Sequence, residues 1–343
     1  MSEKTEGFDA IAEIMKQQYP EQNGLYYGTM LPYMLGGKDP LDGVEIWKSE
    51  DGMPHWHYVT YGFTELYDKE SDDPDTSGYG FELTFRLERG AEEEAPIWPV
   101  NLLQNLARYV FSSGNAFGAG HHLDCNGPIA LEEETRLTAL AFRIDPQLGE
   151  MDTPNGHMIF LQAVAVTREE LEAAMCWNVE KALTEMEKKI PLCITVLDRP
   201  ALMEDRDFRQ AWEEGMEADG SSTGFLFVEK GEIVPGTDRS TLILGTVCTK
   251  TLPLMLKARV GKGRELYLQS RESVFSFRPG LQSKIEKDGE CFLLTLTEQS
   301  LAELCSLLLP HDGCWQLSSM PLTLQLVPTE IKDPDGNVTE VLR

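Results

Sequence analysis

The run YGFELTFRL at residues 79–87 alternates between apolar side chains and a polar or small residue. A period of two is the pattern of a β-strand that buries one face and exposes the other. The chain therefore has to contain a sheet with a covered apolar face. The apolar face carries Tyr79, Phe81, Leu83, Phe85 and Leu87, and the other face carries Glu82, Thr84 and Arg86.

Other runs extend this sheet. VEIWKSE and HWHYVTYGF, at 44–50 and 55–63, are rich in β-forming residues and are separated by DGMP, which predicts a hairpin. HMIFLQAVAV at 157–166 is almost continuously apolar, as in a central strand, and LCITVL at 192–197 predicts a short one. Apolar periodicity, a proline at a helix start and a capping box of Thr167 and Glu170 predict helices at 5–18, 100–112, 167–175 and 178–189.

Strands and helices are segregated rather than strictly alternating, so we predict an α+β fold. AWEEGMEADGSS at 211–222 is acidic and rich in turn-forming residues, and it predicts a linker over 199–222. The linker separates a mixed α/β domain, 1–198, from a β-dominated domain, 223–343. In the second domain we expect short strands, LPLMLKARV at 252–260 among them, and one packed helix at 298–309 capped by Thr297.

The chain carries a formal net charge of −27. An acidic surface repels phosphate backbones, so we expect no nucleic-acid partner. Such a surface attracts a basic protein or peptide and speeds its encounter, although solubility alone also explains it. Residues 250–287 are an exception, with nine basic and three acidic residues.

Location and cofactors are predicted from what the sequence lacks. The chain starts without the apolar core of a signal peptide, and its apolar runs reach about half of a membrane span. The seven cysteines are scattered and form no CxxC pair. We therefore expect a soluble, cytoplasmic monomer with reduced cysteines, no membrane partner and no cofactor.

The histidines raise an alternative function. His55 and His57 lie on one face of a strand and could chelate a metal together with His121 and His122, as in a metal-dependent hydrolase. Metal-site, serine-nucleophile, P-loop and dinucleotide-binding motifs are all absent from the sequence. We therefore predict no metal site, no catalytic residue and no enzyme activity.

Several blocks occur together in a recognisable order. HWHYVTYGFTELY, SGYGFELTFRL, APIWPVNLLQNLARYVFSSGNAF and GHHL have the order and spacing of the N-terminal domain of the suppressor of fused family, which this chain resembles. MDTPNGHMIFLQAVAVTREELEAAMCWN is similar to the next block, so the resemblance spans roughly 20–198. A weaker similarity over 225–330, ending in CWQLSSMPLTLQLVP, indicates the family's C-terminal domain.

The resemblance implies a binding protein without enzyme activity. Animal members of the family hold a transcription factor of the Gli type in the cytoplasm and clamp one of its short peptides between two domains as a β-strand. Bacterial members are proposed immunity proteins that neutralise toxins, often nucleases. This chain lacks the longer loops of the animal proteins, so we expect a bacterial immunity protein with a basic toxin as its partner.

The resemblance also implies three partner-binding residues. The family's peptide groove uses a tyrosine that falls here on Tyr67, and an aspartate that falls on Asp73 or Asp75. All three lie in the acidic loop, defined here as residues 65–75, which contains six acidic residues. A loop of this composition is also typical of a mobile, solvated turn.

Overall fold

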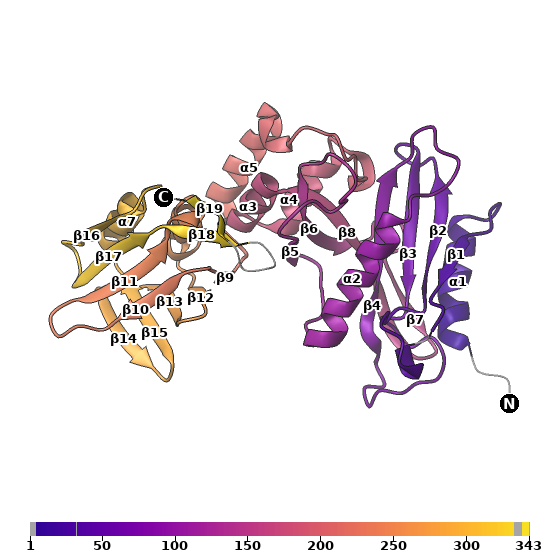
Figure 1. Ribbon diagram of the computed structural model, residues 1–343, viewed down its shortest axis with the longest axis horizontal. Helices are drawn as coiled ribbons and strands as arrows, with labels where there is room; N and C mark the ends of the chain where they lie inside the picture. Colours follow the sequence, from indigo (N-terminus) through magenta and orange to yellow (C-terminus); the bar gives the residue numbers. More distant parts are fainter. Residues whose placement is uncertain (1–4, 32, 333–337, 343) are drawn as a thin grey trace. The chain divides into compact units, whose positions relative to one another are not determined.

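The structure is a computed structural model, and it describes residues 5–31, 33–332 and 338–342. The chain divides into two compact units (Figure 1). Unit 1 comprises Met1–Leu171 and Val179–Arg209, and unit 2 comprises Glu172–Asn178 and Gln210–Arg343. Both units contain helices and sheets, so the predicted α+β class is confirmed.

Unit 1 is built on an eight-stranded sheet in the order β1-β2-β3-β4-β8-β6-β5, with β7 paired to β8. All neighbouring strands are antiparallel except β4 and β8, which run parallel. The strands are β1 (Leu25–Gly28), β2 (Gly43–Ser49), β3 (His55–Tyr61), β4 (Thr76–Glu88), β5 (His122–Asp124), β6 (Leu137–Ile144), β7 (Glu150–Thr153) and β8 (Gly156–Thr167).

The helices of this part of the chain agree with the sequence patterns. They are α1 (Glu6–Gln18), α2 (Trp98–Ser113), α3 (Arg168–Cys176) and α4 (Val179–Glu187). The capping box before α3 is present, since the Glu170 amide donates to the Thr167 hydroxyl and the Thr167 amide donates to the Glu170 carboxylate. The predicted hairpin is β2–β3, and the apolar run at 157–166 is the interior strand β8.

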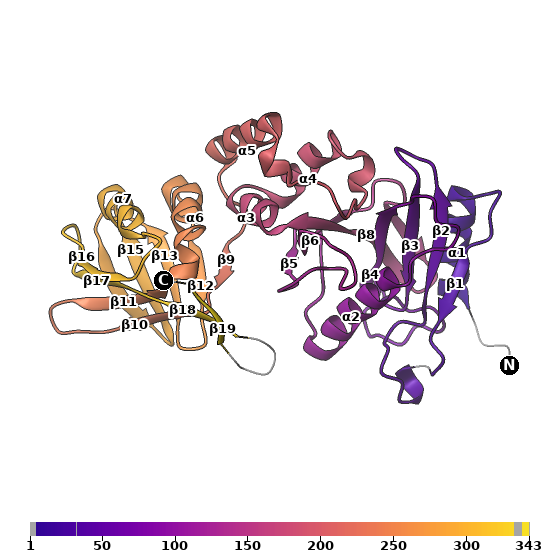
Figure 2. The same cartoon turned by 45° about the horizontal axis from the view of Figure 1, so that its top comes forward.

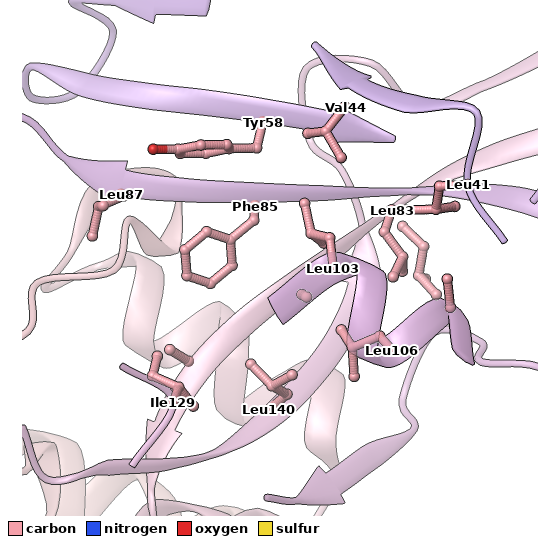
Figure 3. Close-up of a cluster of buried hydrophobic side chains, with 14 of the residues drawn as sticks. Leu41, Val44, Tyr58, Leu83, Phe85, Leu87, Leu103, Leu106, Ile129 and Leu140 are labelled. Carbon is pink, nitrogen blue, oxygen red and sulfur yellow. The ribbon is translucent and has the colours of Figure 1, made fainter. Parts of the chain in front are cut away.

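Strand β4 was predicted to expose its polar face, and this is wrong, because both faces are covered. On one face, α2 packs Leu103 and Leu106 against Leu83 and Phe85 (Figure 3). On the other face, α1 packs against the apolar side chains of β2, β3 and β8. The side chains of Glu82, Thr84 and Arg86 are fully buried on that second face.

Unit 2 holds two further sheets. One has the order β10-β11-β17-β16 and the other β14-β15-β13-β12-β9. Helices α6 (Leu252–Arg259) and α7 (Glu298–Leu307) lie side by side and contact β12 and β15 respectively (Figure 2). The strands are β9 (Phe225–Phe227), β10 (Gly231–Val234), β11 (Ser240–Gly245), β12 (Leu266–Gln269), β13 (Val274–Pro279), β14 (Lys284–Asp288), β15 (Cys291–Leu296), β16 (Gly313–Gln316) and β17 (Leu322–Val327), with a separate pair β18 (Thr329–Lys332) and β19 (Val338–Leu342).

Two strand predictions are wrong. Residues 252–259 form helix α6, because Pro253 suits the first turn of a helix and buried apolar side chains lie on several sides of the segment. Residues 192–197 form a turn with a single bridge from Thr195 to Leu87, and Leu192 and Cys193 there adopt positive φ angles. A left-handed backbone cannot continue a strand ladder. The predicted helix after Thr297 is confirmed as α7, with Thr297 as its N-cap.

The segment predicted to be a turn-rich linker contains helix α5 (Arg206–Asp219). Gly215 is one of the turn-forming residues of this stretch, but a Cβ at this position would lie 2.3 Å from the Trp177 ring, so close packing explains the glycine. The Trp212 indole also donates to the Ala173 carbonyl at 2.6 Å. Whether 1–198 and 223–343 fold separately stays a prediction, which limited proteolysis within 199–222 tests.

The basic segment at 250–287 has a structural role. Arg259 and Arg264 donate to the carbonyls of Ser221 and Asp219, at 3.0 and 2.6 Å, and Lys262 pairs with Glu217. These partners are the last turn of α5 and the residues after it, where cations stabilise the negative end of a helix.

Within the described ranges, none of the helices combines the length and apolar character that crossing a bilayer requires.

Candidate functional site

The two histidines of β3 belong to a buried polar network. Arg86 donates two hydrogen bonds of 2.9 Å to Asp145, and a third of 3.0 Å to His55 Nε2. His57 Nδ1 lies 2.8 Å from the Tyr19 hydroxyl, and its Nε2 lies 3.6 Å from Asp145. The side chains of His55, His57, Arg86 and Asp145 are all fully buried, so the network joins α1, β3, β4 and the end of β6 inside the protein.

The electrostatics of this network favour neutral histidines. Burial, assisted by the Arg86 charge, lowers the pKa of both His55 and His57 to about 4. Burial alone would raise the pKa of Asp145, but Arg86 and the hydrogen bonds hold it well below its usual range. A buried Arg–Asp pair with neutral histidines around it is a structural arrangement that needs no metal.

The structure does not bring the four histidines of the alternative together. His55 and His57 lie on β3, whereas His121 and His122 lie at β5, four strand positions away in the sheet order. Neighbouring strands are about 4.8 Å apart, so the two pairs are separated by roughly 19 Å. In the part of the chain that the structure describes, no group of three or more His, Cys, Asp or Glu side chains could hold a metal ion. In the described residues, the four histidines of this alternative therefore do not form one metal site.

A cavity of about 400 Å³ lies where Tyr67 meets the sheet of unit 1. We call it the Tyr67 pocket. It falls within the usual size range of small-ligand sites. Its walls come from the segment before β2, the chain after β3, the acidic loop and α2. Aromatic side chains in its lining are Tyr33, Phe63, Tyr67, Tyr79 and Phe111, and acidic residues in its lining are Asp42, Glu65, Asp68 and Glu70.

Two tyrosines hold Asp42 in this pocket. The Tyr67 hydroxyl donates to Asp42 Oδ1 at 2.9 Å, and the Tyr26 hydroxyl donates to Oδ2 at 2.6 Å. Burial and the Asp42 carboxylate raise the pKa of Tyr26, so its hydroxyl keeps its proton and remains a donor. The site therefore joins β1, the start of β2 and the acidic loop through one carboxylate.

Glu65 organises the acidic loop. Its carboxylate accepts hydrogen bonds from the amides of Glu70, Ser71 and Gly78, and it pairs with Lys69 Nζ at 2.7 Å. Burial opposes the charge, but Lys69 and these amides lower the pKa of Glu65 to about 2. The loop is thus folded around an ionised carboxylate, which argues against a mobile, solvated turn.

Two other elements anchor the same loop. The Asn155 side-chain amide donates to the carbonyls of Glu65 and Tyr67, at 2.6 and 3.0 Å, from the turn before β8. The Phe8 amide of α1 donates to the Leu66 carbonyl at 2.9 Å. Tyr67 is therefore presented by a backbone fixed on both sides, while 40% of its surface remains exposed.

Glycines and a buried glutamate shape the pocket wall. A Cβ at Gly62 would lie 2.8 Å from the Asp42 amide nitrogen, and a Cβ at Gly78 would lie 2.6 Å from the Phe63 carbonyl oxygen. Both glycines also have positive φ angles, so a larger residue at either position would strain the backbone. Glu82 accepts hydrogen bonds from the amides of Gly62 and Thr64 and from the Thr64 hydroxyl. Burial raises the pKa of Glu82 to about 7, while these bonds favour its ionised form.

The three predicted partner-binding residues lie in one loop but in different settings. Tyr67 lines the pocket, whereas Asp73 and Asp75 are absent from its lining. The Asp73 carboxylate accepts from the Asp75 amide at 3.0 Å, which forms a tight turn and lowers the pKa of Asp73. The Asp75 carbonyl accepts from the His157 amide. A role for either aspartate in partner binding stays a prediction.

Sequence reasoning missed three residues of this site. Asp42 lies in a turn-like DPLDG sequence, where an aspartate is ordinary. Glu65 is one of six acidic residues in its loop, and nothing in the pattern separates it from the others. Asn155 is the only one with a signal, because it belongs to the TPNG turn inside a block shared with the resembled family.

Each unit also has a strand that lies last in its sheet and, among the described residues, pairs on one side only. β1 is the last strand of the unit 1 sheet, and Leu25 on it is half exposed. β9 is the last strand of a unit 2 sheet, and its Phe225 and Phe227 are 50% and 57% exposed. An unpaired edge with exposed apolar side chains is where an extended peptide adds a strand.

Comparison with known proteins places the chain. Residues 37–200 match the family model described as suppressor of fused protein. A chain in the crystal structure of the Sufu–Fu complex is 31% identical to this chain, which covers 98% of it. The TM-score of this match is 0.58 over 62% of this chain. The chain belongs to the suppressor of fused family.

Other suppressor of fused proteins extend the likeness. The suppressor of fused homologs of Homo sapiens and Mus musculus are each 37% identical over 238 residues, which is 63% of this chain and 48% of theirs. The chain thus spans about half the length of these relatives. The chain in the crystal structure of Drosophila suppressor of fused is 22% identical to this chain. The match has a TM-score of 0.80 and covers 95% of this chain and 98% of the Drosophila chain, so the likeness in fold includes residues of both units.

Proposed function

We propose that this member of the suppressor of fused family is a non-enzymatic protein that binds an extended segment of a protein partner at the Tyr67 pocket. The observation that carries the proposal is the fixed presentation of Tyr67 at an aromatic, acid-lined cavity. A rigid aromatic side chain with a polar tip is a typical anchor in protein interfaces. The solved structure of a related chain in a Sufu–Fu complex adds support, since that relative binds a protein.

The charge of the chain supports a basic partner. With a net charge of −27, the surface favours encounter with a cationic protein over an acidic or phosphate-rich one. We propose, from the family resemblance, that the chain acts as a bacterial immunity protein and that its partner is a basic toxin. A gene for such a toxin next to the gene for this chain would support that assignment, and a purified neighbour that does not bind would contradict it.

We propose further that the partner segment is clamped by both units, as the resemblance implies. The open edge strand β9 in unit 2 is the element that would pair with the segment's backbone. Phe227→Ala and Tyr67→Ala should then each weaken binding. If only Tyr67→Ala does so, the pocket is the site and the clamp is wrong.

The proposal is tested with peptides selected from a random dodecapeptide library on the purified full-length chain. A selected peptide is then titrated against the wild type and Tyr67→Ala at two salt concentrations. The matched control is Tyr109→Ala, because Tyr109 is 41% exposed on α2 and stacks on Phe117, outside the pocket lining. We expect Tyr67→Ala to weaken binding at least about tenfold, as for an interface anchor, and Tyr109→Ala to leave it unchanged. Equal affinities for all three proteins would overturn the proposal.

A further inference from the structure

The Tyr67 pocket combines two features that recognise cations. Phe111 at its wall contacts three other aromatic rings, with centroids 5.6 Å from Tyr33, 6.1 Å from Phe63 and 4.9 Å from Tyr79. Aromatic faces attract ammonium and guanidinium groups through their quadrupole. Tyr33 and Tyr67 are 47% and 40% exposed, so an entering group meets aromatic surface first.

The second feature is uncompensated negative charge. Tyr26 and Tyr67 donate one hydrogen bond to each oxygen of Asp42, and they leave its charge unchanged. In the ranges that the structure describes, no Lys, Arg or His side chain pairs with Asp42. A carboxylate offers about two acceptor sites on each oxygen, so each oxygen of Asp42 can accept another donor.

The other charges of the lining do not change this balance. Lys69 neutralises Glu65 and also donates to the Thr76 carbonyl, so its charge is committed to the loop. Asp68 and Glu70 are exposed acidic residues of the lining, and the lining contains neither lysine nor arginine. The interior of the pocket is therefore aromatic, and its charged groups leave an excess of negative charge.

We propose that the Tyr67 pocket binds an arginine side chain of the partner segment, with Asp42 as its charge partner. The inference rests on the proposed function and names the chemistry of the partner at the same site. A guanidinium stacks on aromatic rings and pairs with both oxygens of a carboxylate at once. An ammonium is more strongly hydrated and does neither as well, which favours arginine over lysine.

The test uses N-acetyl-arginine N-methylamide as the probe, titrated into the full-length wild-type chain and followed by NMR on the amides of Asp42, Gly62 and Gly78. The same amide of citrulline is the neutral probe of nearly identical shape, and that of lysine is the second cation. We expect the citrulline probe to bind at least about tenfold more weakly than the arginine probe. A loss of affinity of this size is what we expect when one ion pair and one cation–π contact are removed together. The affinity of the lysine probe should lie between those of the arginine and citrulline probes.

The variants are Asp42→Asn and, as the matched control, Asp39→Asn, since Asp39 lies outside the lining and is already paired with Arg108. Asp42→Asn should weaken binding of the arginine probe about tenfold, so that its affinity approaches that of the citrulline probe for the wild type. Asp39→Asn should leave the affinity for the arginine probe unchanged. The comparison of probes needs only the wild type, so it holds even if Asp42→Asn fails to fold. Equal binding of arginine and citrulline probes, or no shifts at these amides, would overturn the inference.

One further arm separates this inference from the proposed function. Each arginine of a library peptide that needs Tyr67 is replaced by citrulline. Unchanged affinity would leave the proposed function standing and overturn the arginine assignment. A loss of affinity of about tenfold on replacing one arginine would support both the proposed function and the arginine assignment.

Discussion

The Tyr67 hydroxyl donates a hydrogen bond of 2.9 Å to Asp42, which lies 25 residues earlier in the chain and just before strand β2. This bond ties the acidic loop to the sheet at the wall of the pocket. Because Asp42 is also held by Tyr26, the carboxylate has a fixed position before any partner arrives. Such preorganisation lowers the cost of binding.

The Tyr67–Asp42 bond should be measurable as a coupling free energy. In a double-mutant cycle of Tyr67→Phe and Asp42→Asn, we expect a coupling of about 1 kcal/mol in urea unfolding, because the bond involves a charged acceptor but is half exposed. A cycle of Tyr109→Phe with Asp42→Asn is the control and should give no coupling. Additive effects in both cycles would show that the bond does not contribute to stability.

Glu65 should control the order of the acidic loop. Glu65→Gln removes the charge that accepts from three loop amides, so those amides should exchange with solvent faster than in the wild type, as measured by hydrogen–deuterium exchange. Glu70→Gln is the matched control, since its side chain is exposed. Because the pKa of Glu65 is lowered to about 2, its contribution is present above the ordinary value of 4.5 and is lost as the pH falls towards 2. Loop exchange that is unaffected by Glu65→Gln would contradict this role.

The buried histidines should make the protein sensitive to mild acid. Their pKa is lowered from 6.5 to about 4, so the unfolded chain binds protons that the folded protein does not, and stability falls as the pH drops from 6.5 to 4. Each histidine adds a slope of about 1.4 kcal/mol per pH unit within that window. His57→Gln should remove one such slope in unfolding titrations.

Glu82 acts in the opposite sense in the same range. Its pKa is raised to about 7, so its contribution to stability is lost as the pH rises from 4.5 towards 7. Since Glu82 is present in both the wild type and His57→Gln, the difference in slope between the two proteins isolates His57. Identical slopes for the wild type and His57→Gln would contradict the buried, neutral state of this histidine.

Removing Arg86 should be severely destabilising. Arg86→Met leaves Asp145 buried without its charge partner, which typically costs about 3–5 kcal/mol. Arg89→Met is the matched control, because Arg89 pairs with Glu50 near the surface and such pairs contribute about 1 kcal/mol or less. Chemical unfolding of the two variants measures the difference. Similar small losses of unfolding free energy in the two variants would contradict a buried ion pair between Arg86 and Asp145.

The sheet could be predicted from sequence because its signal is local. The alternation at 79–87 and the apolar run at 157–166 are visible in single segments, as is the cap at Thr297. The burial of Arg86 could not be predicted, because its partner Asp145 is 59 residues away and an arginine on a strand usually faces water. Helix α5 was missed because Gly215 is a turn signal until Trp177 packs against it.

The candidate site was predictable only where a family block marked it. Tyr67 was found through the resemblance, and it lines the pocket. Asp42 carries no signal, since its role depends on hydroxyl groups from Tyr26 and Tyr67, which reach it only after the sheet has formed. The resemblance also indicates Asp73 or Asp75 in the same loop, and the structure places both outside the pocket lining.

The most direct test of the account is the exchange footprint of a bound library peptide on the full-length chain. Amide hydrogen exchange is compared between the free protein and the complex. We predict protection of amides in the acidic loop and in the segments that carry Asp42 and Gly62, with Tyr67→Ala removing it. Protection confined to other parts of the chain, with these amides exchanging as in the free protein, would contradict partner binding at the Tyr67 pocket.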